Sequence, residues 1–357
     1  METLYNRSNS WESTFSNTFK VCFLSLMVFT FSQTKSFGEI RRVNNQLTTN
    51  HSQRIYATLQ EAHNFASEGD TLMVEGSTIE YGNLEMTKRL TVIGTGYFLL
   101  ENPNTSASNT LSIFNVIYVK ATAKGSVFIG LVFGTRNGNH TFLIEADDLL
   151  IMRSLISNNL QIWNTVKNIK IIQNYFSRTG SSVFFMGTAN LGFSDITFDN
   201  NILNGNLTAG FSSIQRTFTS IQNNILNGSV DITTTTFRNN IITSQNTNYT
   251  INSSNNQNNL FRGNNPLATI NGNQIYNENQ LFVGPTSAST DGQYVLKSDS
   301  PYLTAGYQGA QPGIFGGNTP YVLSGLPAIP SIYELDVATF GSQENGLNIK
   351  IKAKTNN

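Results

Sequence analysis

Three features of the sequence predict its fold class. They are a repeat of short apolar segments that each contain asparagine, a low content of charged side chains, and an amphipathic helix ahead of the repeats. They predict an all-β protein, a right-handed parallel β-helix (solenoid) with an N-terminal capping α-helix and a C-terminal β tail. We expect four parts along the 357 residues. These are a secretory signal peptide at 1–36, a polar lead-in at 37–55, the β-helix with its cap helix at 56–324, and a linker with a β-hairpin tail at 325–357.

The composition favours a solenoid over a disordered chain. Charged residues make up 12% of the sequence, about half of the ~25% that is typical of soluble domains. Polarity comes instead from Asn, Ser, Thr and Gln, a bias found both in disordered polar tracts and in solenoids with polar turns. Because Ile, Leu, Val and Phe recur throughout the Asn-rich part, we predict the solenoid.

The charge balance argues against two kinds of partner. The formal net charge is zero, and lysine and arginine are scattered along the chain rather than clustered. A nucleic-acid partner needs a basic face, and a polybasic membrane contact needs a basic cluster. We therefore expect no nucleic-acid partner.

The single cysteine, Cys22, lies in an apolar run at 21–31 that follows Lys20 and precedes small or polar residues. The run is too short to cross a bilayer as a helix and is typical of the apolar region of a secretory signal. A buried N-terminal strand or helix is the alternative. An export signal predicts a secreted or cell-surface protein with no transmembrane span after signal removal. The mature chain would also lack cysteine, which excludes disulfides and thiolate metal sites.

A capped helix precedes the first strands. Thr58 and Glu61 have the spacing of a capping box, and apolar residues at 59, 62, 65 and 66 share one helical face. The pattern changes at 68–70, and strand patterns follow at 71–74 and 90–94.

The run from Ala57 to Gly96 resembles the N-terminal cap and first rungs of pectate-lyase-like β-helix proteins. The resemblance implies that the helix covers the open end of the solenoid, where apolar core and unpaired strand edges would otherwise meet water. It concerns architecture and not chemistry. Further along, the stretch 292–317 resembles the closing segment of many secreted bacterial β-helix proteins.

The repeat itself consists of an apolar pair, one or two polar residues, Asn and a second apolar pair. Taking the last Asn of each segment as the register gives a mean period of about 20 residues, which fits one solenoid coil with insertions confined to loops. We expect roughly eight to ten coils at this period. The segments are 156–160, 171–175, 198–202, 221–225, 237–241 and 257–260.

A repeated asparagine at a turn has a physical explanation. Asn tolerates left-handed backbone angles, and its amide can hydrogen-bond to the same amide one coil above and below. We therefore predict an internal asparagine ladder. Its expected members are Asn159, Asn174, Asn201, Asn224, Asn240 and Asn259.

The pattern breaks after residue 265. The Pro-containing stretch 325–330 is expected to be a stiff linker, and two alternating segments at 333–338 and 347–354 are expected to form a hairpin. Lys350, Lys352 and Lys354 would share one face of it. Lysines on an edge strand usually prevent aggregation, and a binding patch is the alternative.

The resemblance implies two kinds of enzyme site, and the sequence shows neither in recognisable form. A lyase of this fold would need an acidic cluster for calcium beside a Lys or Arg base, and a hydrolase would need paired carboxylates. Carboxylates in the solenoid are sparse, and the adjacent pair Asp147 and Asp148 would point to opposite faces of a strand. Asp195 is a further candidate. The catalytic residues and any metal ligands stay unknown.

One outward track could contact a ligand. In the repeat register, Asp199 and Arg238 lie two coils apart, which is about 9 to 10 Å at strand spacing, and Lys170 belongs to a parallel column. Trp163 adds an aromatic surface on which a sugar could stack. A solvated face with weak, screened charge contacts is the alternative.

Three functions are compatible with these observations. The first is a non-catalytic scaffold that binds an extracellular polysaccharide or has a structural role, and it needs no cofactor. The alternative is a pectate-lyase-like polysaccharide lyase acting on an acidic glycan, the one case in which calcium is expected. The third is self-association through the C-terminal strands.

Overall fold

The computed structural model describes residues 38–134, 142–180, 184–186, 190–209, 216–245, 249–286, 288–344 and 346–356. The chain divides into two units between Gly38 and Glu39, and the description below concerns the second unit, Glu39–Asn357. The expected export signal at 1–36, with Cys22, lies outside the described residues.

The described part of the chain is mainly β, and its strands form three parallel sheets and one antiparallel pair. The long sheet contains β1 (Ile40–Val43), β2 (Ile55–Tyr56), β3 (Thr71–Val74), β5 (Thr91–Ile93), β8 (Val127–Ile129), β11 (Leu150–Met152), β14 (Val166–Ile172), β17 (Phe193–Asp199), β19 (Leu207–Thr208), β20 (Arg216–Gln222), β22 (Val230–Arg238) and β24 (Thr250–Gln257). The side sheet contains β4 (Leu84–Met86), β7 (Ile117–Val119), β10 (Phe142–Ile144), β13 (Leu160–Ile162) and β16 (Phe184–Met186). The narrow sheet contains β6 (Ile113–Phe114), β9 (Val132–Phe133), β12 (Leu155–Ile156), β15 (Tyr175–Phe176), β18 (Ile202–Leu203), β21 (Ile225–Leu226), β23 (Ile241–Ile242), β25 (Leu260–Phe261) and β26 (Gln274–Ile275).

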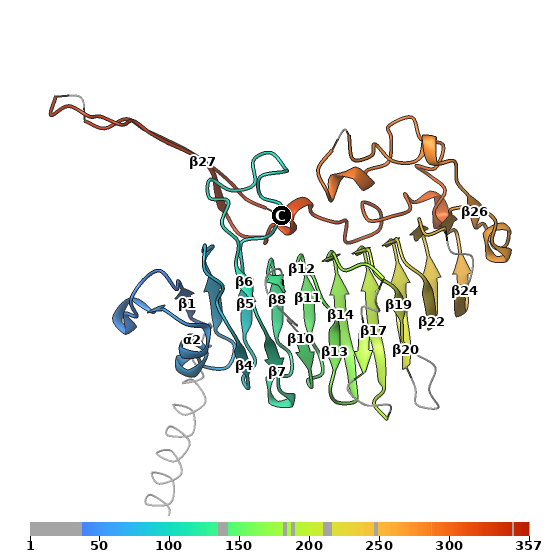
Figure 1. Ribbon diagram of the computed structural model, residues 1–357, viewed down its shortest axis with the longest axis horizontal. Coiled ribbons are helices and arrows are strands. Elements are labelled where there is room, and N and C mark those ends of the chain that lie inside the picture. Colours follow the sequence, from blue (N-terminus) through green and yellow to red (C-terminus); the bar gives the residue numbers. More distant parts are fainter. Residues whose placement is uncertain are drawn as a thin grey trace, which may run out of the picture. The chain divides into compact units, whose positions relative to one another are not determined.

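From β4 to β18 the chain visits these sheets in a repeated order, from the side sheet to the long sheet to the narrow sheet, and from β19 to β26 its described strands belong to the long and narrow sheets alone. Within each sheet a strand pairs with the equivalent strand of the next pass, so that β5, β8, β11, β14 and β17 of the long sheet lie side by side in sequence order in Figure 1. This arrangement is consistent with a β-helix-like solenoid. The prediction of a mainly β fold of parallel strands in stacked sheets is confirmed.

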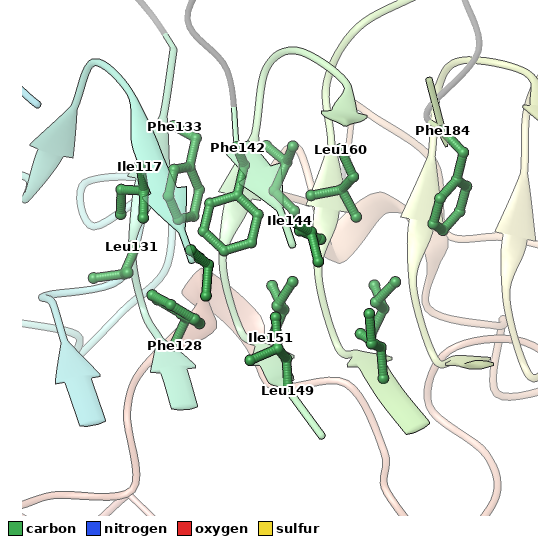
Figure 2. Close-up of a cluster of buried hydrophobic side chains, with 14 of the residues drawn as sticks. Ile117, Phe128, Leu131, Phe133, Phe142, Ile144, Leu149, Ile151, Leu160 and Phe184 are labelled. Carbon is green, nitrogen blue, oxygen red and sulfur yellow. The ribbon is translucent and has the colours of Figure 1, made fainter. Parts of the chain in front are cut away.

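The core lies between the three sheets. In the long sheet the inward residues of successive strands, for example Phe128 and Ile151, are fully or almost fully buried. Figure 2 shows side chains from the side sheet, such as Phe142 and Ile144, pointing toward them. Each large apolar side chain buried in this way contributes about 1.5–3 kcal/mol to the stability of the fold. The buried side chains of successive passes contact one another and form one continuous core cluster.

Helix α2 (Leu59–Phe65) precedes the first full pass and packs on this core. The side chain of Thr58 accepts a hydrogen bond from the backbone N–H of Glu61 at 3.2 Å, which caps the helix N-terminus. Leu59 and Ala62 are fully buried in the core cluster. At the other end, Lys88 Nζ donates to the carbonyls of residues 63, 64 and 66, where a cation stabilises the helix dipole.

The remaining helical turns in the described residues are short 3₁₀ segments. They are η1 (His51–Gln53), η2 (Ala121–Ala123), η3 (Pro266–Thr269), η4 (Glu278–Gln280), η5 (Gly292–Tyr294), η6 (Tyr307–Gly309) and η7 (Leu323–Gly325).

The segment expected as a polar lead-in contributes a strand of its own. β1 pairs in parallel with both β2 and β3, so the long sheet begins at Ile40. Sequence reasoning missed the strand because two arginines occupy its centre. Arg41 is nevertheless buried, and its guanidinium bonds Asp70 at 2.9 Å and the Tyr56 hydroxyl at 2.9 Å.

After β26 the chain runs back along the outer side of the narrow sheet, and we call residues 277–326 the strap. Outward apolar residues of the narrow sheet, among them Val132, Ile202 and Ile241, form a second buried cluster with strap residues such as Ile314 and Tyr321. The strap therefore covers a face that would otherwise expose apolar side chains to water.

The chain ends in an antiparallel hairpin of β27 (Ser331–Val337) and β28 (Ile349–Lys354). Its base is held by the backbone N–H of Ala107, which donates to the carbonyl of Ile332 at 2.8 Å. Asn356 Nδ2 also donates to the carbonyl of Ile329 at 3.1 Å.

Candidate functional site

Asparagines stack in a column at the corner between the long and narrow sheets. Each asparagine donates twice to the side-chain Oδ1 of the next asparagine in the column, once from its own Nδ2 and once from its own backbone N–H. The amide-to-amide distances run from 2.9 to 3.3 Å. The column contains Asn174, Asn201, Asn224, Asn240, Asn259 and Asn273, all of them buried.

The expected ladder needs one correction at its start. Asn159 is half-buried and follows the narrow-sheet strand β12, so it lies at a different corner from the column. The column position of that coil is Ser154, whose N–H donates to Asn174 Oδ1 at 3.0 Å. The error arose because apolar pairs flank both corners. At the other end, Asn273 extends the column beyond the last expected member.

The residue before Ser154 and the residues before the column members from Asn174 to Asn259 face the opposite way and bind the strap. These residues have left-handed backbone angles, which asparagine adopts with less strain than most residues. Asn200 Nδ2, for example, donates to the carbonyls of Ile314 and Gly316, both at 2.8 Å. The strap-binding set is Arg153, Gln173, Asn200, Asn223, Asn239 and Asn258.

The structure brings Asp199 and Arg238 into one hydrogen-bonded chain on the outer face of the long sheet. Asp199 accepts from the Ser220 hydroxyl at 2.8 Å and from the backbone N–H of Gln222 at 2.8 Å. Gln222 Oε1 accepts from Arg238 Nε, so the two charged groups are linked through this amide. The Arg238 guanidinium also lies 4.7 Å from the ring centroid of Tyr307 in the strap.

Burial is the main influence on the Asp199 carboxyl. It raises the pKa of Asp199 to about 6, against the opposing effects of its hydrogen bonds and of the Arg238 charge. These polar groups are largely occupied with one another, and the Arg238–Tyr307 contact joins the chain to the strap.

Trp163 lies away from that chain, and Lys170 lies in the neighbouring outward column of the long sheet, two residues earlier along the strands. Lys170 is exposed on the long sheet and pairs in register with Leu150 and Thr197. Trp163 directly follows β13, and its backbone N–H donates to the carbonyl of Ile144, which places it on the outer side of the side sheet. The four residues expected to share a ligand are therefore divided between two sheets.

Around Trp163 the side sheet presents a mixed polar and aromatic surface, which we call the side-sheet face. Its first outward column contains Tyr118, Leu143 and Gln161, which are aligned by strand pairing. The second contains Lys120, Glu145 and Trp163, which are aligned because the ladder of backbone hydrogen bonds continues one residue past each strand. These six residues make up the face, in which Leu143 is buried and the other five are partly or largely exposed.

The side chains of the side-sheet face are oriented by contacts with one another. Lys120 Nζ bonds Glu145 at 3.0 Å and lies 5.8 Å from the Tyr118 ring centroid. The hydrogen bond to Glu145 raises the pKa of Lys120. Trp163 Nε1 donates to Gln161 Oε1 at 3.1 Å, which holds the indole beside the sheet.

Two aromatic rings on this face are open to solvent. Trp163 is 50% exposed and Tyr118 is 36% exposed, although large aromatic residues are usually buried to a greater extent. They lie two strands apart across the sheet and, because they belong to different columns, two residues apart along the strand direction, so their backbone positions are about 12 Å apart. Sequence reasoning found Trp163 but missed its neighbours, because three-residue strands separated by loops of varying length give no register.

The acidic residues considered for a lyase site lie at another corner. Asp148 accepts from Asn168 Nδ2 at 2.7 Å and pairs with Lys124 at 3.1 Å, and Asp147 accepts the N–H of Lys167. Asp195 is exposed on β17. Within the described ranges, no group of three or more His, Cys, Asp or Glu residues is arranged to hold a metal ion.

Comparison of the chain with protein-family models, curated proteins and solved structures finds no match. The helices in the described part of the chain include none that is long and apolar enough to cross a membrane.

Proposed function

We propose that this chain is an exported, right-handed parallel β-helix of pectate-lyase-like architecture, with α2 as its N-terminal cap, that binds a polysaccharide without cleaving it. The architectural part is supported by the repeated passes through three sheets and by the burial of Leu59 and Ala62 in the core. The apolar run around Cys22 supports export to a secreted or cell-surface location.

The binding part of the proposal rests on one observation, the pair of exposed rings of Tyr118 and Trp163 on the side-sheet face. Sugar rings have apolar C–H surfaces that pack on aromatic faces, and their hydroxyls both donate and accept hydrogen bonds. The Gln161 amide, the Glu145 carboxylate and the Lys120 ammonium offer both kinds of partner between the two rings.

The geometry favours a chain of sugars over a small ligand. The face is part of a sheet surface, and the backbone positions of its two exposed aromatic residues are about 12 Å apart, so an extended polymer could contact both. Lys120 and Glu145 neutralise each other across neighbouring strands. We therefore expect an uncharged polysaccharide rather than an acidic one.

The test is a panel of neutral and acidic polysaccharides, with binding measured by calorimetry or affinity electrophoresis and cleavage measured in the same samples with and without calcium. Trp163→Ala and Tyr118→Ala should each weaken binding to a neutral glycan by tenfold or more. Thermal unfolding of both variants should match that of wild type, which checks that the loss of binding does not come from misfolding.

Matched controls separate this face from the other exposed groups. Lys170→Ala removes an exposed side chain on the long sheet and should leave glycan binding unchanged. Release of unsaturated products would instead support the lyase alternative. Failure of every glycan to bind would contradict the proposal.

A further inference from the structure

The C-terminal hairpin has one apolar face that nothing in the described chain covers over most of its length. Its cross-strand pairs alternate between apolar and charged residues: Leu335 lies opposite Ile351 and Val337 opposite Ile349, whereas Glu334 lies opposite Lys352. The four apolar residues named here keep 47 to 57% of their surface exposed.

The apolar face continues at both ends of the hairpin. Ile332, opposite Ala353, extends it toward the base and is 48% exposed. Toward the tip, Leu347, two residues before Ile349, is 49% exposed. A contiguous apolar surface of this kind usually marks a contact with another molecule. In addition, a lone two-stranded hairpin is marginally stable in water, so a partner would stabilise it.

The opposite face is occupied by ion pairs. Glu334 bonds both Lys350 and Lys352 at 2.5 Å, and these contacts lower the pKa of Glu334. Because charged residues fill this face, the apolar face is the surface left for a partner.

We propose that the apolar face of the hairpin is a self-association surface, on which the same face of a second copy of this chain packs. Two hairpins stacked face to face would form a small four-stranded sandwich, with their apolar residues inside and their ion pairs outside. Lys350 and Lys352 lie on β28 itself, and lysines on an edge strand disfavour edge-to-edge pairing, so the contact is between faces.

The charges of the hairpin favour a second copy over a membrane. Glu334, Asp336 and Glu344 balance Lys350, Lys352 and Lys354, which makes the segment 331–356 neutral. An interfacial membrane anchor typically carries an excess of basic residues on its polar face.

The charges also favour an antiparallel arrangement of the two hairpins. Glu344 lies near the tip and Lys354 at the base, where it is opposite Ser331. A two-fold axis across the paired hairpins brings the tip of each to the base of the other. This arrangement places the Glu344 end of one copy near the Lys354 end of its partner, where opposite charges attract.

The size of the face sets the expected strength. Two strands of about seven residues give a ribbon roughly 23 Å long and 10 Å wide. This is far below the ~800 Å² that each partner buries in a standard interface. We therefore expect a weak dimer, with a dissociation constant in the micromolar range or above.

The experiment is sedimentation velocity on the full-length chain from about 1 to 300 μM, a range suited to weak interfaces. Wild type should show a concentration-dependent monomer–dimer equilibrium, and Leu335→Glu should weaken it at least tenfold. Asp336→Asn, on the charged face, is the matched control and should leave it unchanged. A monomer throughout the range, or equal association of the Leu335→Glu variant, would overturn the proposal.

Cross-linking identifies the face independently of affinity. In a Cys22→Ser background, Ile351→Cys at the centre of the apolar face should form a disulfide-linked dimer on mild oxidation, whereas Lys350→Cys on the charged face should not. Equal cross-linking of the two variants would contradict face-to-face packing. Wild-type monomers that bind lipid vesicles, with loss of that binding in Leu335→Glu, would assign the face to a membrane instead.

Discussion

Asn223 and Asn224 are adjacent in the sequence and bind on opposite sides of the corner between the long and narrow sheets. Asn224 faces inward and joins the column, with its Nδ2 donating to Asn240 Oδ1 at 2.9 Å. Asn223 has a left-handed backbone and faces outward, where its Nδ2 donates to the carbonyl of Gly313 in the strap at 3.2 Å. One pair of asparagines thus links the core of the coil to the segment that covers it.

The column should contribute strongly to stability. Asn224 Nδ2 donates to two carbonyls besides Asn240 Oδ1, and its Oδ1 accepts two donors from Asn201. Asn224→Ala leaves these buried groups without partners at about 1–3 kcal/mol each. We expect the free energy of unfolding to fall by about 3 kcal/mol or more, measured by chemical denaturation.

The control for this prediction is Asn159→Ala, because Asn159 lies outside the column. A substitution at a half-buried site away from special features usually changes stability by about 0.5 kcal/mol or less. Equal destabilisation by the two variants would show that the column has no special role.

The repeat predicted much of the fold because its physical basis is local. An asparagine between two apolar pairs both permits the turn and stacks on its neighbour, so the column from Asn174 to Asn259 could be placed from spacing alone. The same reasoning failed at Asn159, where similar residues surround a different corner. The side-sheet face could not be predicted, because Tyr118 and Trp163 come together only through a register that the intervening loops hide.

The strap also could not be predicted from periodicity. It is held by side chains that donate to backbone carbonyls, and an irregular segment gives no sequence signal for such contacts. The first asparagine of each pair was the available clue. Sequence reasoning gave that first asparagine no role of its own, whereas its side-chain amide fastens the strap.

Removing one of these fastenings should loosen the strap locally. Asn200→Gly keeps the left-handed backbone accessible but removes the donor to Ile314 and Gly316 and the acceptor for the Thr319 hydroxyl. We expect faster amide hydrogen exchange in the strap around residues 313–321 and a loss of about 2–3 kcal/mol in the free energy of unfolding.

Asn168→Gly is the matched control for the strap. Asn168 has the same backbone angle, but its side chain donates to Asp148 at another corner. It should leave exchange in the strap unchanged. If both variants accelerate exchange there equally, the effect comes from glycine in the turn and not from the lost contact.

A second fastening lies at the buried Asp291. Its carboxylate accepts hydrogen bonds from Asn102 Nδ2 at 2.9 Å, from the Ser289 hydroxyl at 3.0 Å and from the N–H of Ser324 at 2.7 Å. Asp291→Asn replaces an acceptor with a donor that faces other donors, at a cost of about 2–5 kcal/mol. We expect a lower melting temperature and easier proteolysis of the strap. Asp299→Asn, at an exposed aspartate of the strap, should change neither.

Stability should also depend on the ionisation of Asp199. Its pKa in the folded chain is raised to about 6 from an ordinary value of 3.8, so the folded state binds the proton more tightly than the unfolded state does. The stabilisation that comes from protonating Asp199 in the folded state is fully present below about pH 4 and is lost as the pH rises through about 6.

The variant Asp199→Asn tests this pH dependence, because it removes the titration but keeps an acceptor for the N–H of Gln222. The free energy of unfolding of wild type should therefore fall relative to Asp199→Asn between pH 4 and 7, by up to about 3 kcal/mol. Denaturation at several pH values measures this difference, and the exposed Asp195→Asn serves as the control. A difference between wild type and Asp199→Asn that stays constant with pH would show that burial does not hold the proton on this carboxyl.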